Sequence, residues 1–134
     1  MSVDQKIFFD TNVLLYLLSA DDRKAEITES VVESGGVINI QVLNEFVNVC
    51  QRKFRMDWSD TRSALVVIRS VCTVEPITES VHDLGTVVCE KYKLSVYDSM
   101  IVAAALEAGC TKLLSEDMHA GLLIERRLVI ENPF

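Results

Sequence analysis

Five short apolar runs recur along the chain, and none of them alternates apolar with polar residues. Each run is about four residues long, which is typical of a strand that is covered on both faces in a parallel sheet. The runs lie at 6–9, 37–40, 72–75, 111–114 and 128–131. The sequence therefore predicts a parallel central sheet of about five strands.

Segments with helical periodicity separate these runs. They lie at 13–18 and 25–34 after the first run, at 41–54 and 59–69 after the second, and at 78–92 and 95–107 after the third. Helices that alternate with strands indicate an α/β fold with right-handed crossovers. We therefore predict a Rossmann-like, three-layer α/β/α sandwich.

A chain of 134 residues is expected to form one domain, here 1–134. The longest apolar runs, 13–18 and 100–106, are too short to span a membrane. Residues 1–6 lack the basic region of a signal peptide, so we expect a soluble, cytoplasmic protein. The four cysteines show neither a CxxC pair nor a Cys/His pair at ligand spacing, which favours buried, reduced thiols.

The formal net charge of −7 argues against nucleic-acid binding through a broad basic face. It does not exclude a nucleic-acid enzyme whose acidic residues surround metal ions. The possible chemistry therefore depends on where the acidic residues lie relative to the predicted strands.

Two aspartates follow predicted strands. Asp10 comes directly after the run 6–9, and Asp117 comes shortly after the run 111–114. Ligands bind beyond the carboxyl ends of the strands in an open parallel sheet, so both side chains are predicted at the ligand edge. A turn or helix-cap role would explain either residue equally well.

Two more acids lie on predicted helices that point to the same edge. Glu45 is one turn into the helix after the second strand, within a polar stripe that could simply be solvated. Asp98 precedes Ile101, Val102 and Ala105 at helical spacing, so it lies on an apolar face where an uncompensated carboxylate is costly. A capping box formed by Ser95 and Asp98 is the structural alternative.

Four carboxylates from four distant segments would repel one another if they met at one edge. A divalent cation removes this repulsion, and an all-oxygen site suits Mg²⁺ or Mn²⁺. Such a site can activate water and stabilise the leaving oxygen of an in-line displacement. The pattern therefore predicts phosphodiester hydrolysis.

The order and spacing of four stretches resemble the PIN-domain ribonucleases, especially the VapC-like toxins of toxin–antitoxin pairs. These stretches are FFDTNVLLYLL, VLNEFVNV, YDSMIVAAAL and LLSEDM, and they run from Phe8 to Met118. The ending VIENPF also resembles the last strand and tail of one branch of these proteins.

The resemblance implies a function and assigns roles to residues. Asp10, Glu45, Asp98 and Asp117 are similar to the family's acidic quartet, which holds Mg²⁺ or Mn²⁺ and activates water on an RNA substrate. Asn12 and Ser115 are similar to residues that orient the site. A small antitoxin partner and a homodimer are also implied, whereas the number of metal ions and a contribution from Glu116 stay open.

The segment around 51–58 carries two further features. Arg52, in the basic cluster 51–55, could contact RNA phosphates or could end a solvated helix. Phe54, Met56 and Trp58 form an apolar patch, for which we predict a core role, although surfaces of this kind bind an antitoxin or a second copy in the family.

Three other functions compete with the nuclease. A PIN-like module could bind RNA or a partner without cutting. A phosphoacceptor receiver domain has a similar size, but its third strand would end in an aspartate where Glu75 and Pro76 stand. A haloacid-dehalogenase-type phosphatase would need a second acid where Asn12 stands.

Overall fold

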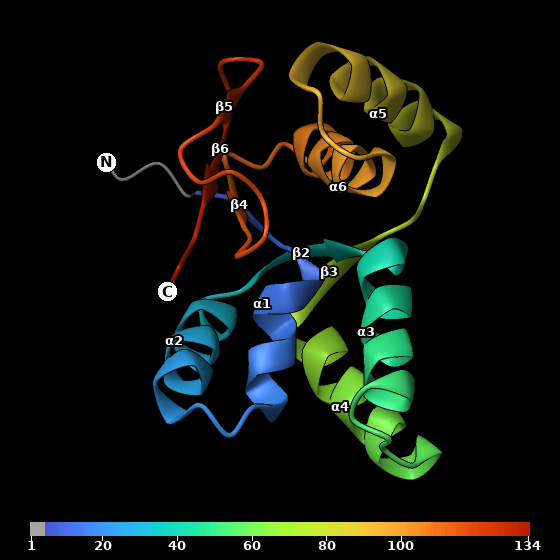
Figure 1. The fold of residues 1–134 in the computed structure, drawn as a ribbon, viewed down its shortest axis with the longest axis vertical. Helices are drawn as coiled ribbons and strands as arrows, with labels where there is room; N and C mark the ends of the chain where they lie inside the picture. Colours follow the sequence, from blue (N-terminus) through green and yellow to red (C-terminus); the bar gives the residue numbers. More distant parts are fainter. Residues whose placement is uncertain (1–4) are drawn as a thin grey trace.

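The computed structural model describes residues 5–134, and within them the centre is a six-stranded sheet in the order β3-β2-β1-β4-β6-β5 (Figure 1). The strands are β1 (Ile7–Phe9), β2 (Gly36–Asn39), β3 (Cys72–Glu75), β4 (Lys112–Leu114), β5 (Leu123–Ile124) and β6 (Leu128–Glu131). All neighbouring strands pair in parallel except β5 and β6, which are antiparallel. The predicted parallel strands are confirmed, and the two-residue β5 is an addition at the sheet edge.

Helices cover both faces of this sheet. They are α1 (Thr11–Leu15), the 3-10 turn η1 (Tyr16–Leu18), α2 (Asp22–Glu33), α3 (Ile40–Arg52), α4 (Trp58–Val71), α5 (Glu79–Tyr92) and α6 (Val96–Glu107). Figure 1 shows α1 to α4 on one side of the sheet and α5 and α6 on the other. The predicted three-layer α/β/α sandwich is confirmed.

The direction of the connections reverses between β1 and β4. The chain passes from β1 outward to β2 and β3, and α5 and α6 then carry it back to β4 on the other side of β1. Phe9 and Leu114 lie opposite each other at the ends of these two strands. Ligands bind beyond the carboxyl ends of the strands at such a switch point, so the residues that follow Phe9 and Leu114 lie where this fold places a site.

Buried side chains hold the start of this edge in place. Phe8, Phe9, Val13 and Leu14 are all fully buried, so both the strand before Asp10 and the helix after it are anchored in the core. Helix α6 is buried along most of its length, from Ile101 to Leu106. No helix within residues 5–134 is long and apolar enough to cross a membrane.

Residues 1–4, which include most of the segment used for the signal-peptide prediction, lie outside the described residues. All four cysteines are free. Cys50, Cys72 and Cys110 are buried as predicted, whereas Cys89 is only half-buried. Burial raises the pKa of the Cys72 and Cys110 thiols to about 11, which keeps them protonated.

The core role predicted for two aromatic residues is wrong. Phe54 is 39% exposed and Trp58 is 52% exposed, and only Met56 packs against the core. Phe54 follows the end of α3 and Trp58 begins α4, so both lie at the junction of two helices. Arg62 covers one face of the Trp58 ring, with its guanidinium carbon 5.4 Å from the ring centre.

Candidate active site

Asp10 is the first residue after β1 and caps the N-terminus of α1. Its Oδ1 accepts a hydrogen bond from the Thr11 amide at 2.8 Å, and its Oδ2 accepts one from the Ser115 hydroxyl at 2.9 Å. The residue is only 6% exposed. The capping role and the position at the ligand edge therefore coexist, because the cap fixes the carboxylate at that edge.

The pKa of Asp10 is raised from 3.8 to about 6. Burial is the largest cause, because it disfavours the charged form, and the negative charges of Glu45 and Asp98 act in the same direction. The hydrogen bonds from Ser115 and Thr11 oppose this rise because they stabilise the carboxylate. A positive charge placed beside Asp10 would therefore stabilise the ionised form strongly.

Glu45 lies one turn into α3 and is held on both carboxylate oxygens. The Thr11 hydroxyl donates to Oε2 at 2.6 Å, and the Gln41 amide nitrogen donates to Oε1 at 2.9 Å. Gln41 also donates to the backbone carbonyl of Tyr97 at 3.3 Å, which ties α3 to the start of α6. Glu45 is thus directed toward the edge of the sheet by hydrogen bonds, rather than extending from a fully solvated helix face.

Asp98 lies in the first turn of α6. Ser95 is the N-cap of this helix and accepts a hydrogen bond from the Asp98 amide at 3.1 Å, so the predicted cap is present. Partial burial raises the pKa of the Asp98 carboxyl, and the charges of Glu45 and Asp117 add to the rise, whereas Ser95 lowers it. The mutual effects on pKa indicate that these acids share one electrostatic environment.

Asn12 connects the segment after β1 to the segment after β4. Its Nδ2 donates to Asp117 Oδ2 at 3.1 Å, and its Oδ1 accepts a hydrogen bond from the Glu116 amide at 3.0 Å. The same Nδ2 lies 3.3 Å from both Asp10 Oδ2 and Ser115 Oγ. Ser115 is fully buried and Asp117 is exposed, so the network leads from the core to the surface.

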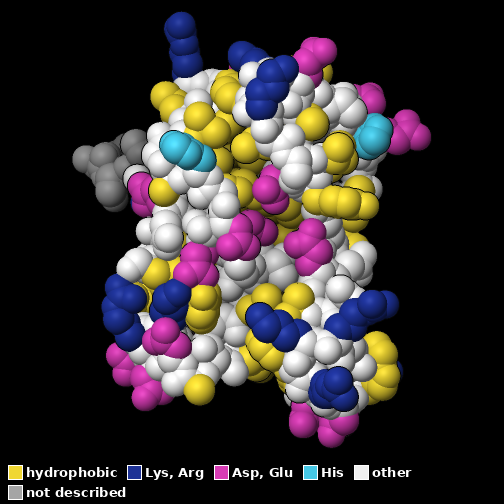
Figure 2. Space-filling view, in the orientation of Figure 1, with side chains coloured by type: hydrophobic (Ala, Val, Ile, Leu, Met, Phe, Trp, Pro, Cys, Tyr) yellow, Lys and Arg dark blue, Asp and Glu magenta, His cyan; other side chains and the backbone are white. Residues whose placement is uncertain are grey.

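All four acids line one pocket of about 290 Å³ at this edge, which we call the acidic pocket. Its wall is completed by Thr11, Asn12, Leu15, Asn48 and Val49. Figure 2 shows Asp and Glu side chains across the middle of this face, with Lys and Arg side chains on the helical lobes below them. The structure thus brings together Asp10, Asn12, Glu45, Asp98 and Asp117, with Ser115 directly behind Asp10.

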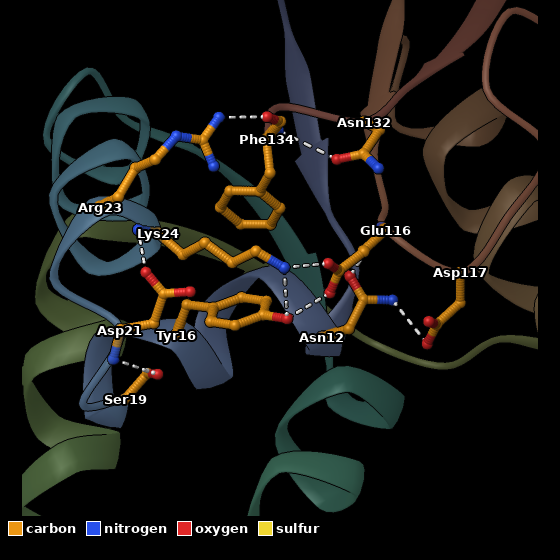
Figure 3. A network of polar contacts seen from close by, with 10 residues as sticks. All are labelled: Asn12, Tyr16, Ser19, Asp21, Arg23, Lys24, Glu116, Asp117, Asn132 and Phe134. Carbon is orange, nitrogen blue, oxygen red and sulfur yellow. Dashed lines mark hydrogen bonds and ion pairs between the residues drawn. The ribbon is translucent and has the colours of Figure 1, made fainter.

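Glu116 is turned away from the other acids. The Lys24 ammonium lies 2.5 Å from its Oε1, and the Tyr16 hydroxyl donates to its Oε2 at 2.5 Å (Figure 3). Lys24 in turn lies over the rings of Tyr16 and Phe134, at 4.7 and 5.3 Å from their centres. Both contacts lower the pKa of the Glu116 carboxyl. Glu116 therefore has a cationic partner of its own and does not line the acidic pocket.

The structure does not bring Arg52 into the site. Its side chain is exposed and it lines neither the acidic pocket nor the larger pocket beside it, whereas the next residue, Lys53, lines the larger one. Sequence reasoning missed Thr11 and Gln41, which hold Glu45, and Asn48, which lines the acidic pocket. Thr11 adjoins Asp10, and the other two lie on the polar stripe of Glu45, so their positions were the available signal.

The donor set of the acidic pocket fits a hard divalent cation, because it is made of carboxylate and amide oxygens. Within residues 5–134, however, no three acidic, histidine or cysteine side chains are close enough to form a ready-made metal cluster. The four acids instead stand around the pocket wall. Since like charges repel, a cation bound between them would draw them together.

Solved structures with the same fold include bacterial toxins and their complexes. A toxin–antitoxin complex from Klebsiella pneumoniae matches with a TM-score of 0.72 at 21% sequence identity, over 96% of this chain and 98% of that chain. VapC20 of Mycobacterium tuberculosis, described as a sarcin-ricin loop cleaving toxin, matches with a TM-score of 0.67 at 19% sequence identity, over 84% of this chain and 92% of that chain. VapBC2 of Rickettsia felis, bound to a DNA fragment from its promoter, matches with a TM-score of 0.67 at 16% sequence identity, over 96% of this chain and 98% of that chain.

At these identities the structural likeness establishes the fold alone. No curated protein matches the chain closely enough in sequence to be called a relative. The sequence profile of the PIN domain, however, matches residues 7–120 and so includes the segments that carry all four acids. The chain belongs to the PIN domain family.

Proposed function

We propose that this protein is a Mg²⁺- or Mn²⁺-dependent endoribonuclease and the toxin of a toxin–antitoxin pair. The observation that carries the proposal is the acidic pocket, in which Asp10, Glu45, Asp98 and Asp117 arrive from four separate segments. RNA phosphates are negatively charged and would be repelled by these carboxylates unless a cation lay between them. Membership of the PIN family argues against the receiver and phosphatase alternatives.

The four acids of the pocket would hold the cation, and a cation held there lowers the pKa of a bound water and neutralises charge on the phosphate. Asn12 orients Asp117, and Ser115 orients Asp10, through the hydrogen bonds described above. Thr11 and Gln41 together fix both oxygens of Glu45. These uncharged donors position the carboxylates without cancelling their negative charge, which is the property that a cation site requires.

The partners follow from the same proposal. The similar structures include a toxin–antitoxin complex and VapBC2 on promoter DNA, and both support a small antitoxin partner for this chain. A homodimer, a single domain over 1–134 and a cytoplasmic location complete the proposal. Size-exclusion chromatography with light scattering, alone and with the product of the neighbouring reading frame, tests the assembly.

The test of activity uses purified protein, freed of any partner, with a mixture of cellular RNAs. We expect cleavage with Mg²⁺ or Mn²⁺, no cleavage with a chelator, and a loss of at least about 100-fold in Asp98→Asn, because electrostatic groups of this kind contribute several kcal/mol to catalysis. Asp57→Asn is the matched control, since Asp57 caps α4 through the Asp60 amide at 2.7 Å but is exposed and outside the pocket.

Two results would separate the nuclease from the silent module. Equal activity in the wild type and Asp98→Asn would assign any cleavage to a contaminant and reject the proposal. Calorimetric binding of Mn²⁺ that is lost in Asp98→Asn, without cleavage of any RNA, would instead identify a PIN module that binds but does not cut.

A further inference from the structure

A second pocket, of about 500 Å³, opens beside the acidic pocket, and we call it the side pocket. Its walls come from α1, η1 and the residues after them, from the end of α3 and the residues after it, and from Glu116 and Asp117 after β4. The two pockets share Asn12, Leu15, Val49 and Asp117 as lining residues. A molecule that fills the side pocket therefore lies directly against Asp117 and next to the acidic pocket.

The walls of the side pocket combine apolar surface with aromatic rings. Leu15, Leu18 and Val49 supply the apolar surface, and Tyr16 and Phe54 supply the rings. The volume is within the usual range of roughly 300 to 1,000 Å³ for small-molecule sites. A flat, partly apolar ring with polar edges is the kind of group that suits these walls.

Phe54 is exposed, yet its backbone is fixed. Its amide donates to the Val49 carbonyl at 3.2 Å, and the Met56 amide donates to the Cys50 carbonyl at 3.0 Å. The side chain of Gln51 adds a hydrogen bond to the Met56 carbonyl at 3.0 Å. Because the backbone is already fixed, only the side-chain rotation of Phe54 is lost when another ring stacks on it.

Three charged residues line the side pocket, Lys53, Glu116 and Asp117, and Glu116 is paired with Lys24. Lys53 lines the pocket, is exposed, and forms no ion pair with any described residue. A chain with a net charge of −7 cannot hold RNA by general electrostatic attraction, so it needs local contacts. Stacking of bases on aromatic rings is the main contact of this kind in single-strand binding.

We propose that the side pocket binds one unpaired base of the RNA, next to the phosphate that is cut. Phe54 stacks on this base, and Lys53 contacts the adjoining phosphate. The inference rests on the proposed ribonuclease function and adds a specificity site to it. Because the pockets share the Asp117 and Asn12 wall, a base in the side pocket places the neighbouring phosphate at the acidic pocket.

The test uses an RNA oligonucleotide that spans a cut site identified in cellular RNA. A series of such oligonucleotides carries a single abasic nucleotide at each position around the cut. For the wild type we expect one adjacent position at which loss of the base raises KM about tenfold, with kcat changed far less.

The variants then test whether Phe54 recognises that position. Phe54→Ala should raise KM about tenfold on intact RNA and should lose its sensitivity to the abasic position, while Phe54→Trp should restore both. Trp58→Ala is the matched control, since Trp58 is a nearby exposed aromatic residue that does not line the side pocket. Calorimetry with Mn²⁺ should give the same affinity in Phe54→Ala as in the wild type.

Each outcome bears on the inference. If the increases in KM caused by Phe54→Ala and by the abasic nucleotide simply multiply when combined, the inference is overturned. An equal increase in KM in Trp58→Ala would also overturn it, as would weaker Mn²⁺ binding in Phe54→Ala. Unchanged cleavage in Phe54→Ala, with weaker binding only of a partner protein, would assign the side pocket to that partner. A wild type that cuts no RNA with either metal would reject the proposed function itself, and the base site with it.

Discussion

Replacing Asp10 with asparagine should make the metal-free protein more stable at neutral pH. The pKa of Asp10 rises from 3.8 to about 6 on folding, so the folded state binds the proton more tightly than the unfolded state. Stability from this group is therefore present at low pH and is lost as pH rises from about 4 through about 6. Asparagine carries no charge and keeps an N-cap oxygen for the Thr11 amide.

The size of the effect follows from the shift in pKa. At about 1.4 kcal/mol per pKa unit, the rise from 3.8 to about 6 corresponds to a gain of up to about 3 kcal/mol for Asp10→Asn at pH 8. For a chain of this length, that gain corresponds to a rise in Tm of roughly 10 °C. At pH 4 the gain should fall to about 0.5 kcal/mol, because the wild-type carboxyl is then protonated in the folded state and partly protonated in the unfolded state.

The assay is urea and thermal unfolding of both proteins in chelator at pH 4, 6 and 8. Asp57→Asn, the exposed cap described above, should change stability by no more than about 0.5 kcal/mol at each pH. Saturating Mn²⁺, at about 100 times its Kd, should stabilise the wild type by about 2.7 kcal/mol and so remove the advantage of Asp10→Asn. A variant that is less stable than the wild type in chelator at pH 8, or a gain that does not depend on pH, would refute the burial argument.

Three further substitutions test other contacts. Ser115→Ala removes the donor to Asp10 Oδ2, so the pKa of Asp10 should rise above about 6, and an unchanged titration of the Asp10 carboxyl by NMR would contradict this. Thr11→Val removes the 2.6 Å hydrogen bond to Glu45 and should lower kcat about tenfold. The free energy of unfolding in urea should change by less than about 1.5 kcal/mol. Full activity would show that Glu45 does not need this hydrogen bond. Gly36→Ala would place a Cβ 2.4 Å from the Phe9 ring and 2.9 Å from the Ile7 carbonyl oxygen. The substitution should therefore lower the free energy of unfolding, measured in urea, by about 2 kcal/mol. An unchanged free energy of unfolding would mean that β1 and β2 can move apart freely.

The strands could be predicted because a strand that is buried on both faces has a local signal, a run of about four apolar residues. The predicted run at 72–75 coincides with β3, and the run at 128–131 coincides with β6. The two-residue β5 could not be predicted, because its antiparallel pairing with β6 depends on a chain reversal and not on an apolar pattern. The hydrophobicity of Phe54 predicts a core position, but the burial of its side chain depends on where α3 ends relative to α4.

The edge of the sheet that carries the acids could be predicted from strand order and helix direction. Which of Glu116 and Asp117 lines the acidic pocket could not be predicted, because this depends on Lys24, which is 92 residues from Glu116 in the sequence. Only the folded structure brings that lysine to Glu116 and leaves Asp117 to Asn12. Pairings between side chains from distant segments leave no periodic signal in the sequence, whereas strands and helices do.

The apolar residues on both sides of Asp10 follow from the instability of the carboxylate they enclose. Burying Asp10 costs about 3 kcal/mol at neutral pH by the reasoning above, and the repulsion from Glu45 and Asp98 is part of that cost. Phe8, Phe9, Val13 and Leu14 are each fully buried, and each contributes roughly 2 kcal/mol of stability, which more than offsets the cost. A polar residue at any of these four positions would remove that contribution and would add the cost of a buried polar group. The apolar residues on both sides of Asp10 in FFDTNVLL thus offset the cost of a buried carboxylate beside a surface pocket.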